Sequence, residues 1–193
     1  MSNASLPSSP PAGAAPGVPP AAVRHKPRRL PGDRGPAPVV ALAWATFFGS
    51  GYVPVAPGTA GTLAAIPLWW VLSSAGTWIY LAATAAVALT GMAAADRAGR
   101  YFGVADSGHI VIDEVAGYLL TMALLPRTAF AAITGFVFFR ICDVLKPWPA
   151  RVFDREPRWK NGAGVVLDDA FAAAWAWALT WGVVLVRQRF LSP

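Results

Sequence analysis

Long uncharged stretches alternate with short polar connectors along this chain. No charged residue occurs between Pro36 and Ala95. None of the apolar stretches alternates apolar and polar residues with the period of two that is typical of strands, and lipid does not tolerate an open sheet edge. We therefore predict helices for the stretches Val39–Phe48, Ala60–Ser74, Trp78–Ala95, Val115–Leu125, Phe130–Phe139 and Ala170–Val186.

These stretches predict an all-α fold, a helical membrane-embedded bundle with about four spans plus short re-entrant or interfacial helices. A full span needs about 20 residues, and several of the stretches are shorter. The chain is 55% hydrophobic and 13% charged, whereas a soluble domain carries about 25% charged residues. Nine Trp, ten Phe and four Tyr fit this class, because amphipathic rings favour the headgroup level of a membrane.

The first 37 positions differ from the rest. Residues 1–37 form a Pro- and Ala-rich tail with a short basic run, which we expect to be disordered because it has too little apolar surface to bury. The order of basic and apolar residues is wrong for a signal peptide. Residues 38–193 are predicted to be one membrane-embedded domain. The positive-inside rule places the tail and the connectors Asp96–Asp106 and Arg140–Asp169 in the cytoplasm.

The net charge of +6 does not indicate nucleic-acid binding. Five of the sixteen basic residues lie in the first 34 positions, and the remainder form no basic stripe interleaved with aromatics. Anionic membrane lipids are the expected partner, and no obligate protein partner is evident. The lone Cys142 excludes an intrachain disulfide.

Acidic residues crowd the ends of the apolar stretches. A carboxylate there must be paired, hydrated or bound to a cation, so such acids indicate a functional site. Arg140 and Lys146 are interleaved with them, which favours a site for metal and phosphate at a membrane surface. The acids are Asp106, Asp113, Glu114, Asp143, Asp154, Asp168 and Asp169.

A loop rich in Gly and Pro, residues 49–62, leads into an apolar run. Glycines let backbone N–H groups approach an anion, and a helix N-terminus adds partial positive charge, so the loop suits a phosphate. Gly58, Thr59 and Thr62 are the candidate contacts. The alternative is a simple turn between membrane helices. The Gly-Lys-Ser/Thr ending of a P-loop is missing.

The segment 106–117 carries Asp113 and Glu114 next to each other. If helical from about Ser107, it stacks Asp113 over Gly117, and that glycine would permit close approach of a neighbouring helix. The two acids point about 100° apart, so they share a site only if it lies between their directions. The alternative is a solvated helix start, where acids favour the dipole.

Two further segments carry candidate chemistry. A helix that Pro147 should terminate carries Arg140, Asp143 and Lys146 at intervals of three residues, along one slowly drifting face. These side chains suit a phosphoryl group and its metal. The alternative is a ladder of ion pairs within the helix. A Gly-rich loop then precedes Asp168 and Asp169. Asp168 is a natural N-cap for the last helix. A second acid directly after it adds the oxygen ligands that a Mg²⁺ site needs.

Taken in order, these segments resemble the phosphatidylglycerophosphatase A family over about Val39 to Val186. The resemblance implies a Mg²⁺-dependent enzyme that removes the terminal phosphate from phosphatidylglycerophosphate, giving phosphatidylglycerol and inorganic phosphate. It also implies a multi-pass protein of a bacterial-type inner membrane with its site facing the cytoplasm. The matching stretches are Gly49–Thr62, Asp106–Glu114, Phe139–Pro149 with Lys-Pro-Trp-Pro, and Gly162–Asp169.

The resemblance leads to a hypothesis for each residue. The metal ligands are Asp113, Glu114, Asp168 and Asp169. The residues that bind phosphoryl oxygens are Gly58, Thr59, Thr62, Arg140 and Lys146. The catalytic residues are Asp106, Asp113, Asp143 and Lys146, with Asp106 or Asp143 as general base or further ligand. Attack by water and a covalent aspartyl-phosphate both remain open.

The alternative from another class is a phospholipid-headgroup binding or transport protein that does not hydrolyse its ligand. Acid clusters in helices also serve carriers, but the inverted repeats typical of a transporter are missing. The acid pattern of phosphatidyl transferases is missing as well. His109 is interpreted as a polar neighbour of the site, because no second histidine follows to complete a histidine-phosphatase motif.

Overall fold

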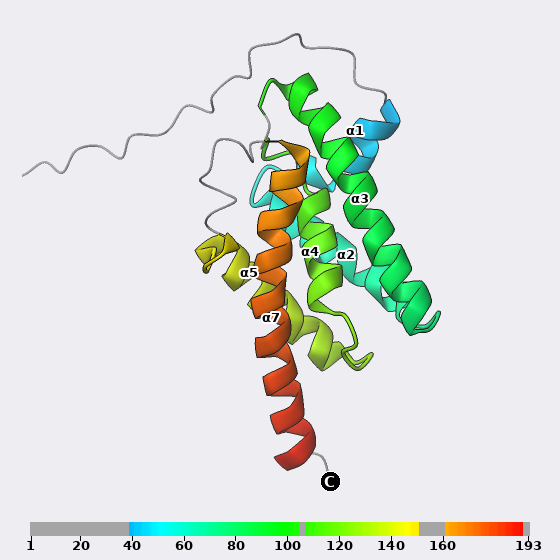
Figure 1. Cartoon of the computed structure of the whole chain (residues 1–193), viewed down its shortest axis with the longest axis vertical. Coiled ribbons are helices and arrows are strands. Elements are labelled where there is room, and N and C mark those ends of the chain that lie inside the picture. Colours follow the sequence, from blue (N-terminus) through cyan, green and yellow to red (C-terminus); the bar gives the residue numbers. More distant parts are fainter. Residues whose placement is uncertain (1–38, 105–106, 151–160, 191–193) are drawn as a thin grey trace, which may run out of the picture.

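A computed structural model describes residues 39–104, 107–150 and 161–190, and helices form all the regular structure in these ranges. The all-α prediction is therefore confirmed for the part of the chain that is described (Figure 1). The predicted tail, residues 1–37, lies outside these ranges, as do Asp106 and Asp154. The elements are α1 (Val39–Ala45), the 3₁₀ helix η1 (Ser50–Tyr52), α2 (Pro57–Leu72), α3 (Thr77–Phe102), α4 (Ile112–Thr121), α5 (Ala129–Leu145) and α7 (Gly162–Phe190).

The short helix α4 is the centre of the bundle. It packs against α2, α3, α5 and α7, and Figure 1 shows it enclosed by them. Most of its residues are buried. Two tyrosine hydroxyls fix it to its neighbours: Tyr118 donates to the carbonyl oxygen of Ala132 at 3.1 Å, and Tyr80 donates to the carbonyl oxygen of Leu119. The C-terminal half of α4 is therefore held against α3 and α5.

Two glycines allow α7 to pack closely on its neighbours. A Cβ atom on Gly117 would lie 2.5 Å from the Phe139 ring and 3.4 Å from the Cβ of Asp169, so the predicted close approach at Gly117 is confirmed. A Cβ atom on Gly162 would collide with the backbone of α3 at Met92 and Asp96. The start of α7 is thus fixed against α3 and α4.

The last helix begins earlier than the sequence indicates. The Gly-rich segment predicted as a loop forms the first turn of α7, because its small residues pack against α3. Asn161 caps this helix, its Oδ1 accepting a hydrogen bond from the backbone N–H of Gly164 at 3.0 Å. Asp168 lies inside α7, so the interpretation of Asp168 as an N-cap is wrong.

The start of α4 also differs from the prediction. The helix begins at Ile112, not near Ser107. Ser107 instead accepts a turn hydrogen bond from the N–H of Ile110 at 2.8 Å, and the N–H of Val111 donates to the carbonyl oxygen of Ala45 at 2.9 Å. These bonds tie the segment to α1 and leave Asp113 and Glu114 in the first turn of α4.

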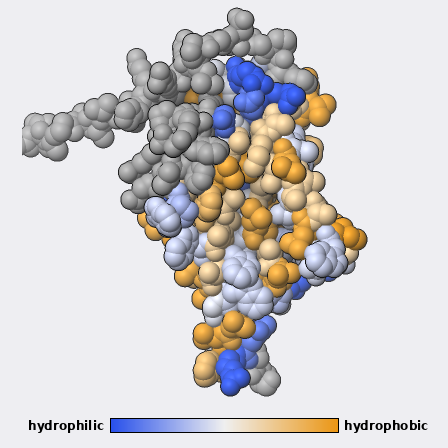
Figure 2. Space-filling model, viewed as in Figure 1, coloured by the Kyte–Doolittle hydropathy of each residue, from blue (hydrophilic) through white to orange (hydrophobic). Residues whose placement is uncertain are grey.

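Two helices, α3 and α7, are long and apolar enough to cross a membrane. They contain 26 and 29 residues, and only 33% of the most apolar window of each is buried inside the protein. Helices of this length extend for about 39 and 43 Å, which exceeds the hydrocarbon thickness of about 30 Å. Figure 2 shows a largely apolar middle between hydrophilic ends. About four spans were predicted, but α2 and α5 contain only 16 and 17 residues.

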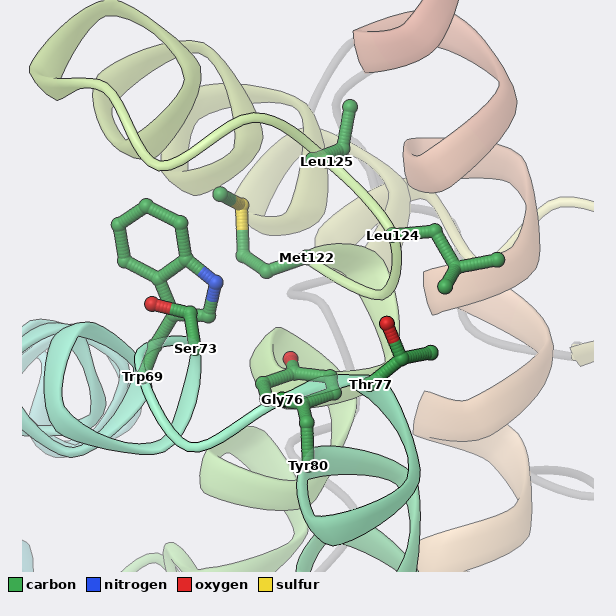
Figure 3. Close-up of a pocket in the computed structure, with 8 residues that line it drawn as sticks. All are labelled: Trp69, Ser73, Gly76, Thr77, Tyr80, Met122, Leu124 and Leu125. Atoms are coloured by element: carbon green, nitrogen blue, oxygen red, sulfur yellow. The ribbon is translucent and has the colours of Figure 1, made fainter.

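A cavity of about 200 Å³ lies where the α2–α3 loop meets the α4–α5 loop (Figure 3). Its lining consists of Trp69, Ser73, Gly76, Thr77, Tyr80, Met122, Leu124 and Leu125. Tyr80 is the only titratable group in this lining, and its hydroxyl already donates a hydrogen bond to the carbonyl oxygen of Leu119. The cavity therefore offers little chemistry, and the acidic residues of α4 lie at the other end of this helix.

The packing at Gly117 predicts the effect of a substitution. Gly117→Leu should lower the free energy of unfolding by about 1–3 kcal/mol, because Phe139 and Asp169 leave no room for a side chain. Thermal or denaturant unfolding of the purified chain in detergent measures this. Gly182→Leu is the control, since a Cβ atom there meets nothing within 4 Å. Equal losses in both variants would contradict the role given to Gly117.

Candidate functional site

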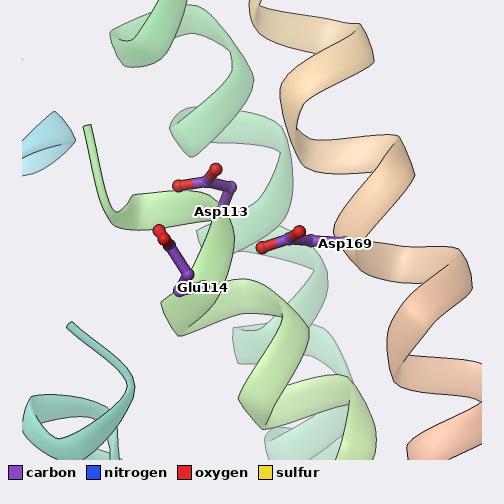
Figure 4. Close-up of side chains that lie close together, drawn as sticks. All are labelled: Asp113, Glu114 and Asp169. Atoms are coloured by element: carbon purple, nitrogen blue, oxygen red, sulfur yellow. The ribbon is translucent and has the colours of Figure 1, made fainter. Parts of the chain in front are cut away.

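Three carboxylates from two helices meet beside the start of α4. Asp113 and Glu114 belong to the first turn of α4, and Asp169 extends toward them from α7 (Figure 4). One carboxylate oxygen from each lies within 4.8 Å of the other two. The two adjacent acids on α4 therefore do share one site, which lies between their directions. We call these three residues the acid cluster.

Most of the acid cluster is buried. Asp113 and Asp169 are 7% and 2% exposed, and Glu114 is half-buried. The Oε2 atom of Glu114 and the Oδ2 atom of Asp169 are buried and accept no hydrogen bond from the described residues. Buried polar atoms without partners are rare in folded proteins and costly. A cation between these oxygens would remove that cost.

Burial also changes the protonation of Glu114. Burial, together with repulsion from Asp169 and Asp143, raises the pKa of Glu114 to about 8, against the opposing effects of Asp113 and Arg140. The protein part of the site thus holds more negative charge than it can stabilise alone. Carboxylate oxygens are the ligands of hard divalent cations such as Mg²⁺. The residues present fit a metal site of that kind.

Arg140 and Asp143 lie beside the acid cluster on α5. Arg140 Nη1 lies 2.8 Å from Asp143 Oδ2, and their side chains are 20% and 13% exposed. The ion-pair alternative thus holds for these two residues. Asp143 is also close enough to Glu114 and Asp169 for their charges to interact. The pair therefore borders the acid cluster and brings one guanidinium to it.

Lys146 and Asp168 form a second ion pair that the sequence did not predict. Lys146 caps α5 in the left-handed conformation, with φ of 43°, and its Nζ pairs with Asp168 Oδ2 across to α7. Burial lowers the pKa of Lys146, but Asp168 and Asp169 outweigh this and raise it above its usual value, so the lysine stays cationic. Asp168 is placed next to the acid cluster but outside the three-residue group.

The start of α2 forms another wall of the site. Ala56 caps this helix in the left-handed conformation, with φ of 50°, and Pro57 is its first residue. A Cβ atom on Gly58 would collide with Glu114 Oε1 and lie 3.3 Å from Arg140 Nη2. The N–H groups of the first helical turn have no intrahelical acceptor. Those of Gly58 and Thr59 are therefore donors beside the acid cluster.

Two predicted polar residues have structural partners. The hydroxyl of Thr62 is buried and donates to the carbonyl oxygen of Gly58 at 2.9 Å. The Nδ1 atom of His109 lies 3.1 Å from the carbonyl oxygen of Gly51, and its ring packs against Tyr52 and Phe102. Thr62 thus shapes the start of α2, and His109 ties the η1 region to the loop before α4.

The fit of the acid cluster to a metal leads to a binding prediction. Glu114→Gln should weaken Mn²⁺ binding by at least about tenfold, because a neutral amide replaces the carboxylate that would give its negative charge to the ion. Electron paramagnetic resonance of free Mn²⁺, titrated with the purified chain, measures the affinity. Asp96→Asn is the matched control, since Asp96 lies on α3 and pairs with Arg100. Unchanged Mn²⁺ affinity in Glu114→Gln would exclude Glu114 as a ligand.

Comparison with known proteins identifies the family. The family model described as phosphatidylglycerophosphatase A matches residues 43–184. Phosphatidylglycerophosphatase A of Escherichia coli (strain K12) is 39% identical over 129 residues, which cover 66% of this chain and 74% of that protein. Phosphatidylglycerophosphatase A of Haemophilus influenzae (strain Rd) is 40% identical over 134 residues, 68% of this chain and 81% of that protein. No solved structure matches. The chain belongs to the phosphatidylglycerophosphatase A family.

Proposed function

We propose that this chain hydrolyses phosphatidylglycerophosphate to phosphatidylglycerol and inorganic phosphate with the help of Mg²⁺. The observation that supports this most strongly is the acid cluster, in which Asp113, Glu114 and Asp169 lie together with a guanidinium and a helix N-terminus beside them. The names of the two bacterial relatives give the substrate class. A pure binding protein would not need buried acids beside the site that holds a phosphate anion.

Asp113, Glu114 and Asp169 would hold the metal. Their oxygens are close together, and Glu114 Oε2 and Asp169 Oδ2 accept no hydrogen bond from the described residues. Bound there, Mg²⁺ supplies positive charge for the phosphoryl oxygens and makes water a better nucleophile. Asp168, also predicted as a ligand, would act through its ion pair with Lys146 and through water.

Hydrogen-bond donors on three sides of the acid cluster would bind the phosphoryl oxygens. Arg140 offers a planar fork of donors, which suits a phosphate better than a point charge does. The first-turn N–H groups of Gly58 and Thr59 add neutral donors and the helix dipole. Lys146 remains cationic and would stabilise charge on the ester oxygen as it leaves.

The proposed reaction needs one proton acceptor and one water molecule. The water molecule gives one proton to the base as its oxygen forms a bond to phosphorus, the bond from phosphorus to the glycerol oxygen breaks, and the glycerol oxygen takes up a proton that the base returns through solvent. Asp143 is our candidate for the base, because it borders the acid cluster while Arg140 orients it. Asp106 remains a second candidate and lies outside the described residues.

We further propose that the protein is a multi-pass protein of the bacterial inner membrane with the acid cluster facing the cytoplasm. The helices α3 and α7 would span the bilayer, and α2 and α5 would supply the two shorter spans. In the sequence, the connectors 96–106 and 140–169 contain eight of the eleven basic residues that follow the tail, which favours the cytoplasmic side for these connectors.

Loss of one cluster carboxylate should abolish turnover. Asp169→Asn should lower Mg²⁺-dependent phosphate release from phosphatidylglycerophosphate by at least about 100-fold, since the metal supplies several kcal/mol of charge stabilisation. Phosphate release in detergent micelles measures the rate, and Asp96→Asn controls for loss of a carboxylate elsewhere. Full activity of Asp169→Asn would remove Asp169 from the site. Lipid binding by the wild-type chain without any release would favour the headgroup-binding alternative.

The close contact at Gly58 gives a second kinetic prediction. Gly58→Ala should lower kcat/KM by about tenfold or more, because the added methyl group would displace Glu114 and Arg140. Gly108→Ala is the control, since a Cβ atom there meets nothing within 4 Å. The two variants are compared by initial rates over a range of substrate mole fractions. Equal activity of both variants would contradict the contact between α2 and the acid cluster.

A further inference from the structure

A groove lies between the start of α5 and the end of α7, at the end of the molecule opposite the acid cluster. It consists of two adjoining hollows with volumes of about 410 and 500 Å³. Phe130 and Arg187 line both hollows. The final turns of α7 extend beyond the other helices here (Figure 1), so the groove opens to the surroundings of the protein.

The two hollows differ in chemistry. The first is bordered by polar groups of Thr128, Arg187 and Gln188. The second is lined by Gly182, Val183 and Val186 together with Phe130 and Arg187, so Arg187 is the only residue in this lining with a polar side chain. A hollow with several polar side chains that continues into a mainly apolar one matches an amphiphile, whose charged head and hydrocarbon chain need different surroundings.

Arg187 stacks on an aromatic ring and has no ion-pair partner among the residues that the structure describes. Its Cζ lies 4.0 Å from the centroid of the Phe130 ring, and a guanidinium stacked in this way still offers its edge N–H groups to an anion. No carboxylate of the described residues pairs with Arg187. Arg127, which stacks on Trp70 at 4.9 Å, and Arg189 add positive charge to the same end. This end of the described chain therefore attracts anions.

The position of Arg187 along α7 indicates which anion it meets. Arg187 follows Asp169 by 18 residues on one continuous helix, which corresponds to about 27 Å. The hydrocarbon core of a bilayer is about 30 Å thick. When the acid cluster lies at one headgroup level, Arg187 therefore lies near the opposite one, where lipid phosphates are the abundant anions.

We propose that this groove binds one anionic phospholipid of the leaflet opposite the acid cluster. The lipid phosphate lies at Arg187 and Thr128, and one acyl chain follows Gly182 and Val183 along α7. The proposal depends on α7 crossing the membrane and not on the hydrolytic reaction. It assigns the groove a structural lipid that fixes the far ends of α5 and α7 to each other.

Native mass spectrometry of the full chain in neutral detergent tests this proposal. Titration with dioleoylphosphatidylserine, which is neither substrate nor product of the proposed reaction, should show one tightly bound lipid, and dioleoylphosphatidylcholine should bind more weakly. Arg187→Gln should weaken the binding of phosphatidylserine by about tenfold or more, because a charge-assisted contact to the phosphate is lost. Gly182→Phe should also weaken it by filling the apolar hollow, and the space around Gly182 lets that variant fold.

Two control variants distinguish lipid binding in this groove from lipid binding elsewhere on the protein. Arg189→Gln removes the same charge two residues away and lines neither hollow, so its affinity should stay within about twofold of the wild type. Asp169→Asn should retain the bound lipid, which distinguishes the groove from the acid cluster. Equal losses in Arg187→Gln and Arg189→Gln would overturn the proposal in favour of a diffuse basic surface. Loss of the lipid in Asp169→Asn with retention in Arg187→Gln would also overturn it.

Discussion

Three carboxylates that lie within 4.8 Å of one another, two of them on buried residues, impose the constraint on which the rest of this structure depends. Their repulsion and desolvation must be offset, and the fold surrounds them with the means to do so. Arg140 lies beside them on α5, and the first turn of α2 contacts Glu114 at Gly58. Lys146 adds a positive charge next to them by pairing with Asp168. The close packing of α4 and α7 at Gly117 brings Asp169 to Asp113 and Glu114. Helix packing and site chemistry are therefore set by the same contacts.

The proposed membrane placement gives the acid cluster its second constraint. The helices α3 and α7 are long enough to cross a bilayer, and only 33% of the most apolar window of each is buried inside the protein. Asp169 lies two turns into α7, so the acid cluster lies about 10 Å along this helix from its first residue. A lipid phosphate held at a headgroup could reach this depth while its acyl chains stay in the bilayer. This placement explains why the acids are buried although the substrate is charged.

Local features of the sequence predicted much of this arrangement. Hydrophobic stretches located the helices, Pro147 marked the end of α5, and the small residue at 117 marked a close helix contact. The sequence could not show that α7 begins at Gly162, because the reason is a contact with α3, which is remote in the chain. The pairing of Lys146 with Asp168 was missed for the same reason. The short apolar stretches also gave too little information to fix the number of spans, since helix tilt and packing decide which of them cross.

The central claim is that Asp113, Glu114 and Asp169 together hold a divalent cation. A crystal structure of the full chain grown with Mn²⁺, with anomalous scattering collected at the manganese edge, tests it most directly. Our account predicts an anomalous peak within coordinating distance of oxygens from all three residues, with Arg140 close to but not on the ion. A peak elsewhere, with Glu114 and Asp169 instead bonded to Arg140 or to each other, would contradict it.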